Sequence, residues 1–231
     1  MAKMHRGILA VWSDITPEAA ADYDAWYEQS HMFERLAVDG IHRARHYRTV
    51  AGAQQYFTYF VADDAAIFRS PSYLESANNT SPWTQRILPH FRNTYRTAFN
   101  VIRRVGWGDG AAALTIRLAA REGCEAGLTD WLGQELFPEL LERPGVIGAQ
   151  IWRADLDATL VSVQDSEIRP EKDRTSPLAI FIEGTNPDSI KAVSEGSLSV
   201  SALINRGATK KAIVSRHSLM NSAEKNGAPE I

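Results

Sequence analysis

The amino-acid sequence predicts an α+β fold in which two βαββαβ units follow one another in a single chain. The prediction depends on two stretches, DAWYEQSHMFERLAVDGIHRARHYR at 24–48 and TDWLGQELFPELLERPGVIGAQIWR at 129–153. They align without gaps at an offset of 105 residues and share seven identities, including a tryptophan and a glycine. Such self-similarity indicates duplicated structural units. The 231 residues are 44% hydrophobic and 23% charged, which is a globular composition sufficient for one large or two small domains.

The elements of the first unit are predicted from apolar runs, caps and turn residues. Thr16 is an expected N-cap and Pro17 suits a first helical position. Gly40 marks the turn after that helix, and Gly52 joins two runs rich in Tyr, Phe and β-branched residues. We expect a strand at 6–13, a helix at 17–37, strands at 41–49 and 55–62, a helical stretch at 65–91 interrupted near 78–79 and 82, and a strand at 94–105.

The second unit repeats this order. We expect strands at 111–119, 146–154, 178–183 and 210–217, and helices at 122–143 and 188–205. The charged segment 155–176 is longer than its counterpart and is interpreted as a hairpin extension or a mobile loop. The proposed division is a first repeat at 1–106, a linker at 107–111, a second repeat at 112–220 and a flexible tail at 221–231.

The order βαββαβ is that of the ferredoxin-like split unit. One such sheet carries helices on one face and leaves its other face bare, so two sheets packed together would bury both bare faces. We therefore expect tandem ferredoxin-like repeats packed as one pseudo-dimeric α+β barrel, the first repeat being the active half and the second a structural copy.

Charge and motif content exclude several classes of function. The net charge of −3 gives no basic footprint for nucleic acid or an anionic membrane, and no apolar run approaches the ~20 residues of a membrane helix. The apolar run near residue 11 is too short for the core of a signal peptide, so a cytoplasmic location is expected. Cys124 is the only cysteine. Phosphate-loop, dinucleotide and nucleophile-elbow motifs are absent, so we expect no metal and no cofactor.

The two copies differ along one face of the matched helices and strands. Three leucines of the second copy (Leu132, Leu136, Leu140) are replaced by Tyr27, His31 and Arg35, and two strand isoleucines (Ile147, Ile151) by His42 and His46. If the matched faces meet, the polar groups converge in the first copy, where a cavity would remove the cost of burying them. The alternatives are a helix rotated toward solvent, an arginine that snorkels, or satisfied core histidines. His42 and His46 lie roughly 13 Å apart on a strand, too far to share a metal.

The first copy also resembles a known superfamily. The run Trp26-Tyr27 with His31 and Glu34, then Gly40, Arg45 and Tyr47, is similar to the dimeric α+β barrel proteins, and closest to EthD-like members. The runs Ser70-Pro71-Ser72-Tyr73, Pro82-Trp83-Thr84 and His90-Phe91-Arg92 resemble the same group. The resemblance implies two ferredoxin-like units that form a barrel. The superfamily includes cofactor-free monooxygenases, muconolactone-type isomerases, polyketide cyclases and haem-associated enzymes, so the fold does not select the reaction.

These observations favour an enzyme that acts on a small-molecule substrate by histidine acid–base chemistry. His31 is the expected acid–base residue, and Tyr27 and Arg35 would orient a substrate oxygen or stabilise an enolate-like charge. The expected substrate-binding residues are His42, His46, Trp26, Trp83, His90 and Arg92. A lyase or isomerase reaction on an oxygenated, cyclic or aromatic molecule is the leading hypothesis. The alternatives are a cofactor-free monooxygenase and a non-catalytic small-ligand-binding barrel. A further homodimer is possible, because exposed sheet edges in this fold invite pairing.

Overall fold

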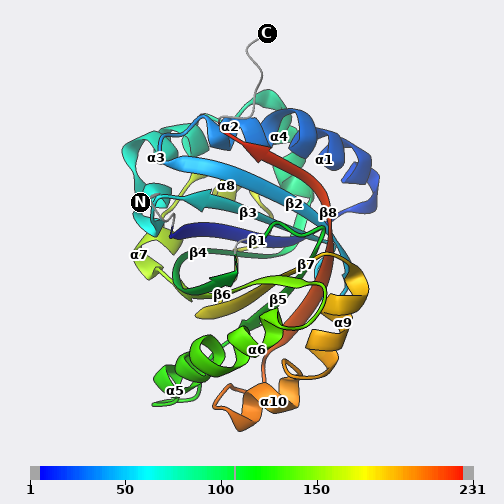
Figure 1. Ribbon diagram of the computed structural model, residues 1–231. Coiled ribbons are helices and arrows are strands. Elements are labelled where there is room, and N and C mark those ends of the chain that lie inside the picture. The colour runs from blue at the N-terminus through cyan, green and yellow to red at the C-terminus, as the bar shows by residue number, and fades with distance from the viewer. Residues whose placement is uncertain (1–5, 107, 226–231) are drawn as a thin grey trace.

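The computed structural model describes residues 6–106 and 108–225, and in these residues the strands form a closed antiparallel barrel (Figure 1). The strand order is β1-β3-β2-β8-β5-β7-β6-β4. The first half contains β1 (Gly7–Ile15), α1 (Ala20–Trp26), a π-helix (Tyr27–His31), α2 (Met32–Leu36), β2 (Ile41–Ala51), β3 (Tyr56–Ala62), α3 (Pro71–Asn78), α4 (Pro82–Ile87) and β4 (Phe91–Gly106). Short 3-10 turns precede α1 and α3 and follow α4.

The second half repeats the same order of elements. It contains β5 (Ala112–Leu118), α5 (Glu125–Asp130), a π-helix (Trp131–Leu136), α6 (Phe137–Leu141), β6 (Val146–Ala154), α7 (Leu156–Thr159), α8 (Gln164–Ile168), β7 (Leu178–Gly184), α9 (Pro187–Glu195), α10 (Val200–Asn205) and β8 (Ile213–Glu224). Both copies therefore contain a π-helical turn at matched positions, which the sequence pattern did not predict. Gly40 and Gly145 follow the matched helices with φ of +85° and +86°, a conformation that favours glycine.

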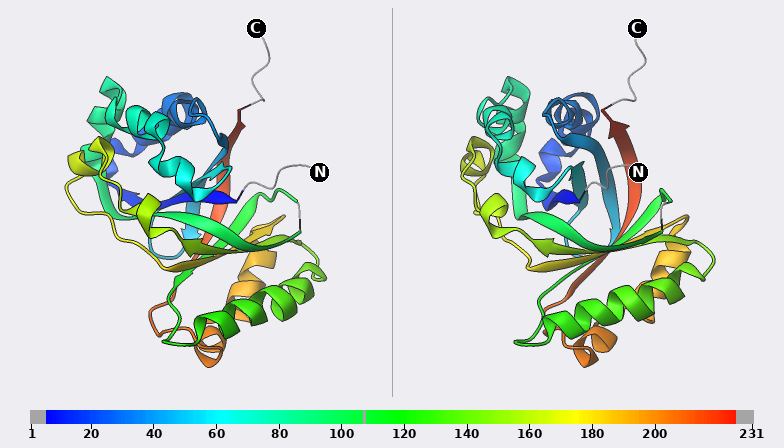
Figure 2. Two further views of the ribbon diagram at one scale, coloured as in Figure 1. Left: turned by 90° about the vertical axis from the view of Figure 1, so that its left-hand side faces the viewer. Right: turned by 60° about the vertical axis from the view of Figure 1, so that its left-hand side comes forward.

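The halves are joined by their longest strands. β4 of the first half pairs with β6 of the second, and β8 of the second half pairs with β2 of the first. The expected pair of stacked sheets is thus one continuous barrel, with the helices in two layers on opposite sides of it (Figures 1 and 2). A closed barrel offers no edge strand within the part that the structure describes, so a homodimer would need another surface.

Three buried clusters fill the molecule. One lies between the first-half helices and the barrel, and includes Trp26, Tyr27 and Phe60. The second lies under the second-half helices and is made mainly of Leu, Ile and Val. The third fills the barrel itself with the aromatic rings Trp12, Tyr47, Phe57, Tyr59, Phe99, Trp152 and Phe181. No helix of the described residues is long and apolar enough to cross a membrane.

The structure differs from the sequence interpretation of two irregular segments. Residues 155–176 form no hairpin: they contain α7 and α8, and Ala158 and Val163 pack into the first-half cluster. Figure 2 shows these two short helices beside the first-half helices. We call residues 155–176 the strap. The tail was expected from 221, but β8 continues to Glu224 in register with β2, and only residues 226–231 lie outside the described residues.

Candidate functional site

A stack of aromatic and imidazole rings joins the first-half helix to the barrel. Tyr27, on the π-helix, lies parallel to His46 of β2, with ring centroids 4.2 Å apart and an interplanar angle of 10°. His31 lies 5.2 Å from Tyr27 and stacks on Trp26 at 4.1 Å. The stripe of the helix therefore faces the sheet rather than solvent, and His31 is only 8% exposed. The structure thus brings together His31, Tyr27 and His46.

His31 also contacts a carboxylate. Its Nδ1 lies 3.7 Å from Oε2 of Glu34, one turn along the helix. Ser30 donates a hydrogen bond of 2.7 Å to the other oxygen of Glu34. Hydrogen bonding to His31, partly opposed by burial, lowers the pKa of Glu34 to about 2. The carboxylate is therefore ionised at neutral pH and orients the imidazole.

The other titratable groups of the stack are held neutral. Burial, with Arg48 and His31 nearby, lowers the pKa of His46 to about 3, and Nδ1 of His46 lies 2.8 Å from the Thr58 hydroxyl. Burial raises the pKa of Tyr27. A neutral phenol donates a hydrogen bond at pH 7, so Tyr27 suits the binding of an oxygen and His46 the support of its ring.

Arg35 lies one turn beyond His31, buried against α3. It donates a hydrogen bond of 2.8 Å to the Ser76 hydroxyl, and its guanidinium lies 5.8 Å from the centre of the Tyr73 ring. The Tyr73 hydroxyl accepts a hydrogen bond of 3.1 Å from Arg96 of β4. Two buried arginines therefore meet at Tyr73, and Arg35 does not snorkel to solvent.

The matched region of the second half is apolar. Leu132, Leu136 and Leu140 are buried at the positions of Tyr27, His31 and Arg35, and Ile151 is buried at the position of His46. The same backbone, π-helix included, therefore packs hydrocarbon in one copy and rings and charges in the other.

Four other predicted binding residues lie outside this cluster. His42 sits at a β-bulge between Ile41 and Arg43, where its Nε2 lies 2.9 Å from Asp63. The bulge changes the alternation of side chains along β2, so the side chains of His42 and His46 lie in different environments. Trp83 donates to Asp22 at 2.9 Å, which ties α4 to α1.

His90 and Arg92 lie after α4 and form local contacts there. The Thr16 hydroxyl lies 2.7 Å from Nδ1 of His90, so it contacts the imidazole in place of the expected helix cap. Arg92 donates to the carbonyl groups of Pro89 and Phe91. Both residues, predicted to bind substrate, thus form their contacts outside the ring cluster. Trp26 does belong to the cluster, and its Nε1 donates to Thr84 at 3.0 Å.

The sequence reasoning missed several members of the cluster. Tyr23 and Tyr56 contact each other at 4.4 Å, and the Tyr56 ring stacks on His46 at 5.5 Å. Tyr23 lies four residues before Tyr27, one helical turn along the same face, so its spacing was a usable signal. Arg169 comes from the strap of the opposite half and lies 4.7 Å from the centre of the Phe91 ring, a contact that spacing alone could not predict.

The rings fill most of the space where a cavity was expected. None of the four cavities described here is lined by Tyr27, His31 or His46. A surface groove of about 620 Å³ between α2 and α3–α4 is lined by Glu34 and Ser76, the direct partners of His31 and Arg35. This groove therefore adjoins the cluster through Glu34 and Ser76.

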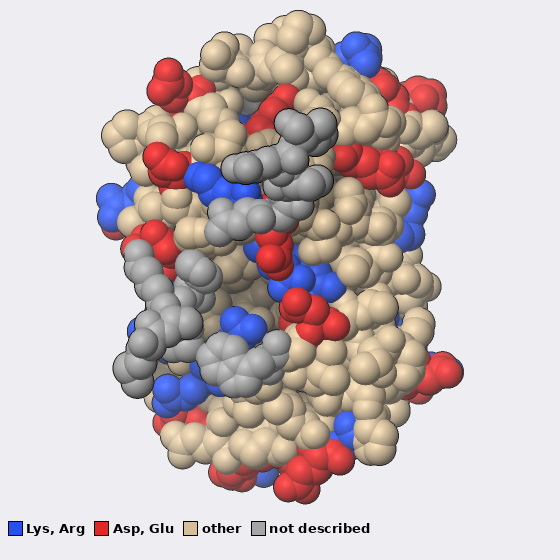
Figure 3. Space-filling view, turned by 45° about the horizontal axis from the view of Figure 1, so that its top comes forward, with Lys and Arg blue, Asp and Glu red and all other residues tan. Residues whose placement is uncertain are grey.

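Two other cavities lie at the barrel. One, of about 330 Å³, opens at one end of the barrel and is lined by residues of both halves, including Tyr59 and Glu183. Buried Arg45 donates a hydrogen bond to Glu183 beneath it. Acidic and basic side chains are interspersed on the face drawn in Figure 3. No group of three or more His, Cys, Asp or Glu suited to a metal occurs within 6–106 and 108–225.

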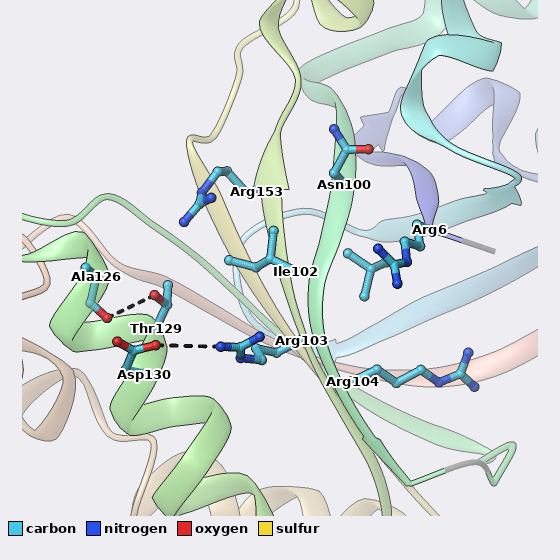
Figure 4. A pocket seen from close by; sticks show the side chains of 10 residues that line it. Arg6, Asn100, Ile102, Arg103, Arg104, Ala126, Thr129, Asp130 and Arg153 are labelled. Carbon is cyan, nitrogen blue, oxygen red and sulfur yellow. Dashed lines mark hydrogen bonds and ion pairs between the residues drawn. The ribbon is translucent and has the colours of Figure 1, made fainter. Parts of the chain in front are cut away.

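The largest described cavity, of about 790 Å³, is a groove between β4 and α5 (Figure 4). Arg103 extends from β4 toward Asp130 of α5, at 3.8 Å, and Arg153 pairs with Glu125 at 2.7 Å. These arginines are exposed and paired with acids, so the groove lacks the buried acid–base groups of the Tyr27–His31–His46 cluster.

The comparisons with known proteins agree with this architecture. No protein-family model and no curated protein matches the sequence. Similar solved structures include an anthrone oxidase-like protein, with a TM-score of 0.64, 11% identity, and coverage of 96% of this chain and 94% of that one. A protein named as a monooxygenase from Lactobacillus acidophilus has a TM-score of 0.60, 11% identity, and coverage of 95% and 97%. A protein named as a chlorite dismutase has a TM-score of 0.55, 9% identity, and coverage of 94% and 96%.

The chain has the fold of the ferredoxin-like dimeric α+β barrels. The predicted fold class is therefore confirmed, with both units in one chain and one closed barrel. At these identities the likeness establishes the fold alone.

Proposed function

We propose that this protein is an enzyme whose active site is the Tyr27–His31–His46 cluster of the first half, and that it belongs to the EthD-like group of the fold. The observation that carries the proposal is the asymmetry between the copies. A buried imidazole beside an ionised carboxylate stands where the second copy has a leucine. Buried polar groups are costly to keep for packing alone, so their presence in one copy only supports a chemical role.

His31 is the proposed acid–base group. It takes a proton from a carbon or phenol of the substrate, and Glu34 favours the imidazolium that forms. Tyr27 and Arg35, on either side along the helix, donate hydrogen bonds to the oxygen on which negative charge develops. A small, oxygenated, cyclic or aromatic molecule suits a cluster of aromatic and imidazole rings, which it would approach from the groove lined by Glu34 and Ser76. Return of the proton to another atom, or loss of a leaving group, completes an isomerase or lyase reaction.

Oxygenation without a cofactor is the second candidate. It is favoured by the names of the similar structures, an anthrone oxidase-like protein and proteins named as monooxygenases. The same first step applies: a methylene beside an aromatic ketone loses a proton, and the carbanion reacts with O₂ to give a carbonyl group and water. If the ring cluster only holds a ligand, the protein is a binding barrel, and no product forms.

Turnover of a substrate panel separates these functions. Anthrone and smaller cyclic ketones are incubated with the protein in D₂O, while O₂ is followed with an electrode and deuterium incorporation by NMR. Deuterium exchange without O₂ uptake supports the isomerase or lyase reaction, and O₂ uptake supports the oxygenase. Binding with neither change throughout the panel contradicts an enzymatic role for these substrate classes.

A further inference from the structure

An arginine is buried inside the barrel without an acidic partner. Arg117, next to the C-terminal end of β5, is 1% exposed and makes no ion pair with a carboxylate of the described residues. Its Nη2 donates to the side-chain carbonyl of Gln54, but Nε and Nη1 have no hydrogen-bond partner there. The buried Arg45 at the other end of the barrel, in contrast, is paired with Glu183.

Aromatic faces account for only part of the environment of Arg117. The guanidinium lies 4.1 Å from the ring centre of Tyr95 and 4.8 Å from that of Trp12. Cation–π contacts stabilise a guanidinium by less than its dehydration costs. Burial lowers the pKa of Arg117 to about 10, which still leaves it charged at pH 7.

The neighbours of Arg117 are neutral or positive. His217, fully buried, lies 2.8 Å from Thr115 through Nε2 and 3.0 Å from Thr49 through Nδ1. Burial lowers the pKa of His217 to about 3, so at pH 7 its imidazole is neutral and adds no negative charge beside Arg117. Arg174 adds a second guanidinium, 5.6 Å from the centre of the Tyr95 ring.

This end of the barrel is covered by the turn between β2 and β3. Gln54 lies in that turn, and its Nε2 donates to the carbonyl of Asn93 at 3.3 Å. The backbone N–H of Ala53 donates to the Ser215 hydroxyl at 3.3 Å. One neutral amide oxygen therefore stands where a buried guanidinium ordinarily has a carboxylate.

We propose that Arg117 forms the floor of an anion-binding site inside the barrel, which takes a small monoanion such as a halide or a carboxylate under the 51–55 turn. This site is separate from the Tyr27–His31–His46 cluster, and it does not depend on the proposed reaction. The monoanion supplies the missing negative charge and accepts hydrogen bonds from Nε or Nη1, as buried charges require.

Thermal unfolding in different sodium salts at one ionic strength tests the proposal. Chloride and formate are compared with sulfate, for the native protein, Arg117→Met and the exposed control Arg103→Met. An anion that binds a specific site, at a concentration tenfold above its dissociation constant, raises the melting temperature by roughly 3–6 °C in a chain of this length. We expect this rise for the native protein and the control, and its loss in Arg117→Met.

The variant itself is expected to fold, since an apolar side chain of similar length removes the buried charge. Crystals soaked in sodium bromide give the second measurement. An anomalous peak in contact with the guanidinium supports the site. Absence of that peak, together with equal salt responses of the native protein and Arg117→Met, would overturn it and leave Arg117 held by its rings and Gln54 alone.

Discussion

Tyr27 of the π-helix and His46 of β2 lie face to face, with ring centroids 4.2 Å apart and planes only 10° from parallel. This contact joins the first-half helical layer to the barrel at the point where the second half has Leu132 and Ile151. The two copies therefore share a backbone at this place and differ in the chemistry of the side chains that it buries.

Reciprocal substitution between the copies separates chemistry from packing. His31→Leu gives the first copy the side chain of the second, so the fold should persist while turnover falls by about 10²–10⁴. Leu136→His buries a polar group among hydrocarbon, and should lower the free energy of unfolding by at least about 2 kcal/mol with little effect on turnover of the folded protein. Urea unfolding measures the free energy of unfolding of each variant, and initial rates measure its turnover. Unfolding of His31→Leu would indicate that His31 is a packing residue.

The buried histidines should make stability pH-dependent. The folded-state pKa values of His46 and His217 are lowered by burial to about 3. The unfolded chain takes up protons below about pH 6.5 and the folded chain does not, so stability falls as the pH drops from 6.5 toward 3. Each histidine contributes up to about 1.4 kcal/mol per pH unit. His217→Gln should reduce the slope of unfolding free energy against pH, and an unchanged slope would contradict burial of a neutral imidazole.

Glu34 should make stability depend on pH in a lower range than the two histidines do. Its folded pKa of about 2 lies below the usual 4.5, so the stability it contributes is present above pH 4.5 and is lost as the pH falls toward 2. Glu34→Gln should therefore be less sensitive to acid than the native protein between these values. Circular dichroism during acid titration measures the difference. Identical acid midpoints would show that the contact with His31 is not formed in solution.

The ion pair inside the barrel should be essential to the fold. Glu183→Gln leaves buried Arg45 with only the half-exposed Asp109, at 3.9 Å, as an acidic neighbour, and should cost about 3–5 kcal/mol. The exposed helix pair Glu139–Arg143 is the matched control, and Glu139→Gln should cost about 0.5 kcal/mol or less. Denaturant unfolding measures the loss of unfolding free energy in each variant. Similar costs for the two variants would mean that water reaches the Arg45–Glu183 pair.

Much of this architecture can be predicted from the sequence, because local signals agree with the fold. Ser70 and Ser81 cap α3 and α4, each followed by a proline at the first helical position, which explains the interruption expected near 78–82. The helical stripe predicted Tyr27, His31 and Arg35 on one buried face, and the structure places them there.

The remaining features depend on geometry that spacing does not encode. A β-bulge at Ile41/Arg43 separates His42 from His46, and the matched strand has a bulge at Val146/Gly148. The strap reaches the first-half cluster from the opposite half, so Arg169 has no local signal. The charge balance inside the barrel, Arg45 with Glu183 and Arg117 without an acid, joins residues of both halves and emerges only when the barrel closes.

His31 is the residue on which the proposed acid–base chemistry of the first copy depends, and the second copy has Leu136 in its place. Deuterium incorporation from D₂O into cyclic ketones, followed by NMR for the native protein, His31→Leu and Leu136→Met, tests this dependence most directly. We expect the native protein and Leu136→Met to catalyse exchange, and His31→Leu to catalyse it at least 10²-fold more slowly. Equal exchange by the native protein and a folded His31→Leu variant would contradict the claim.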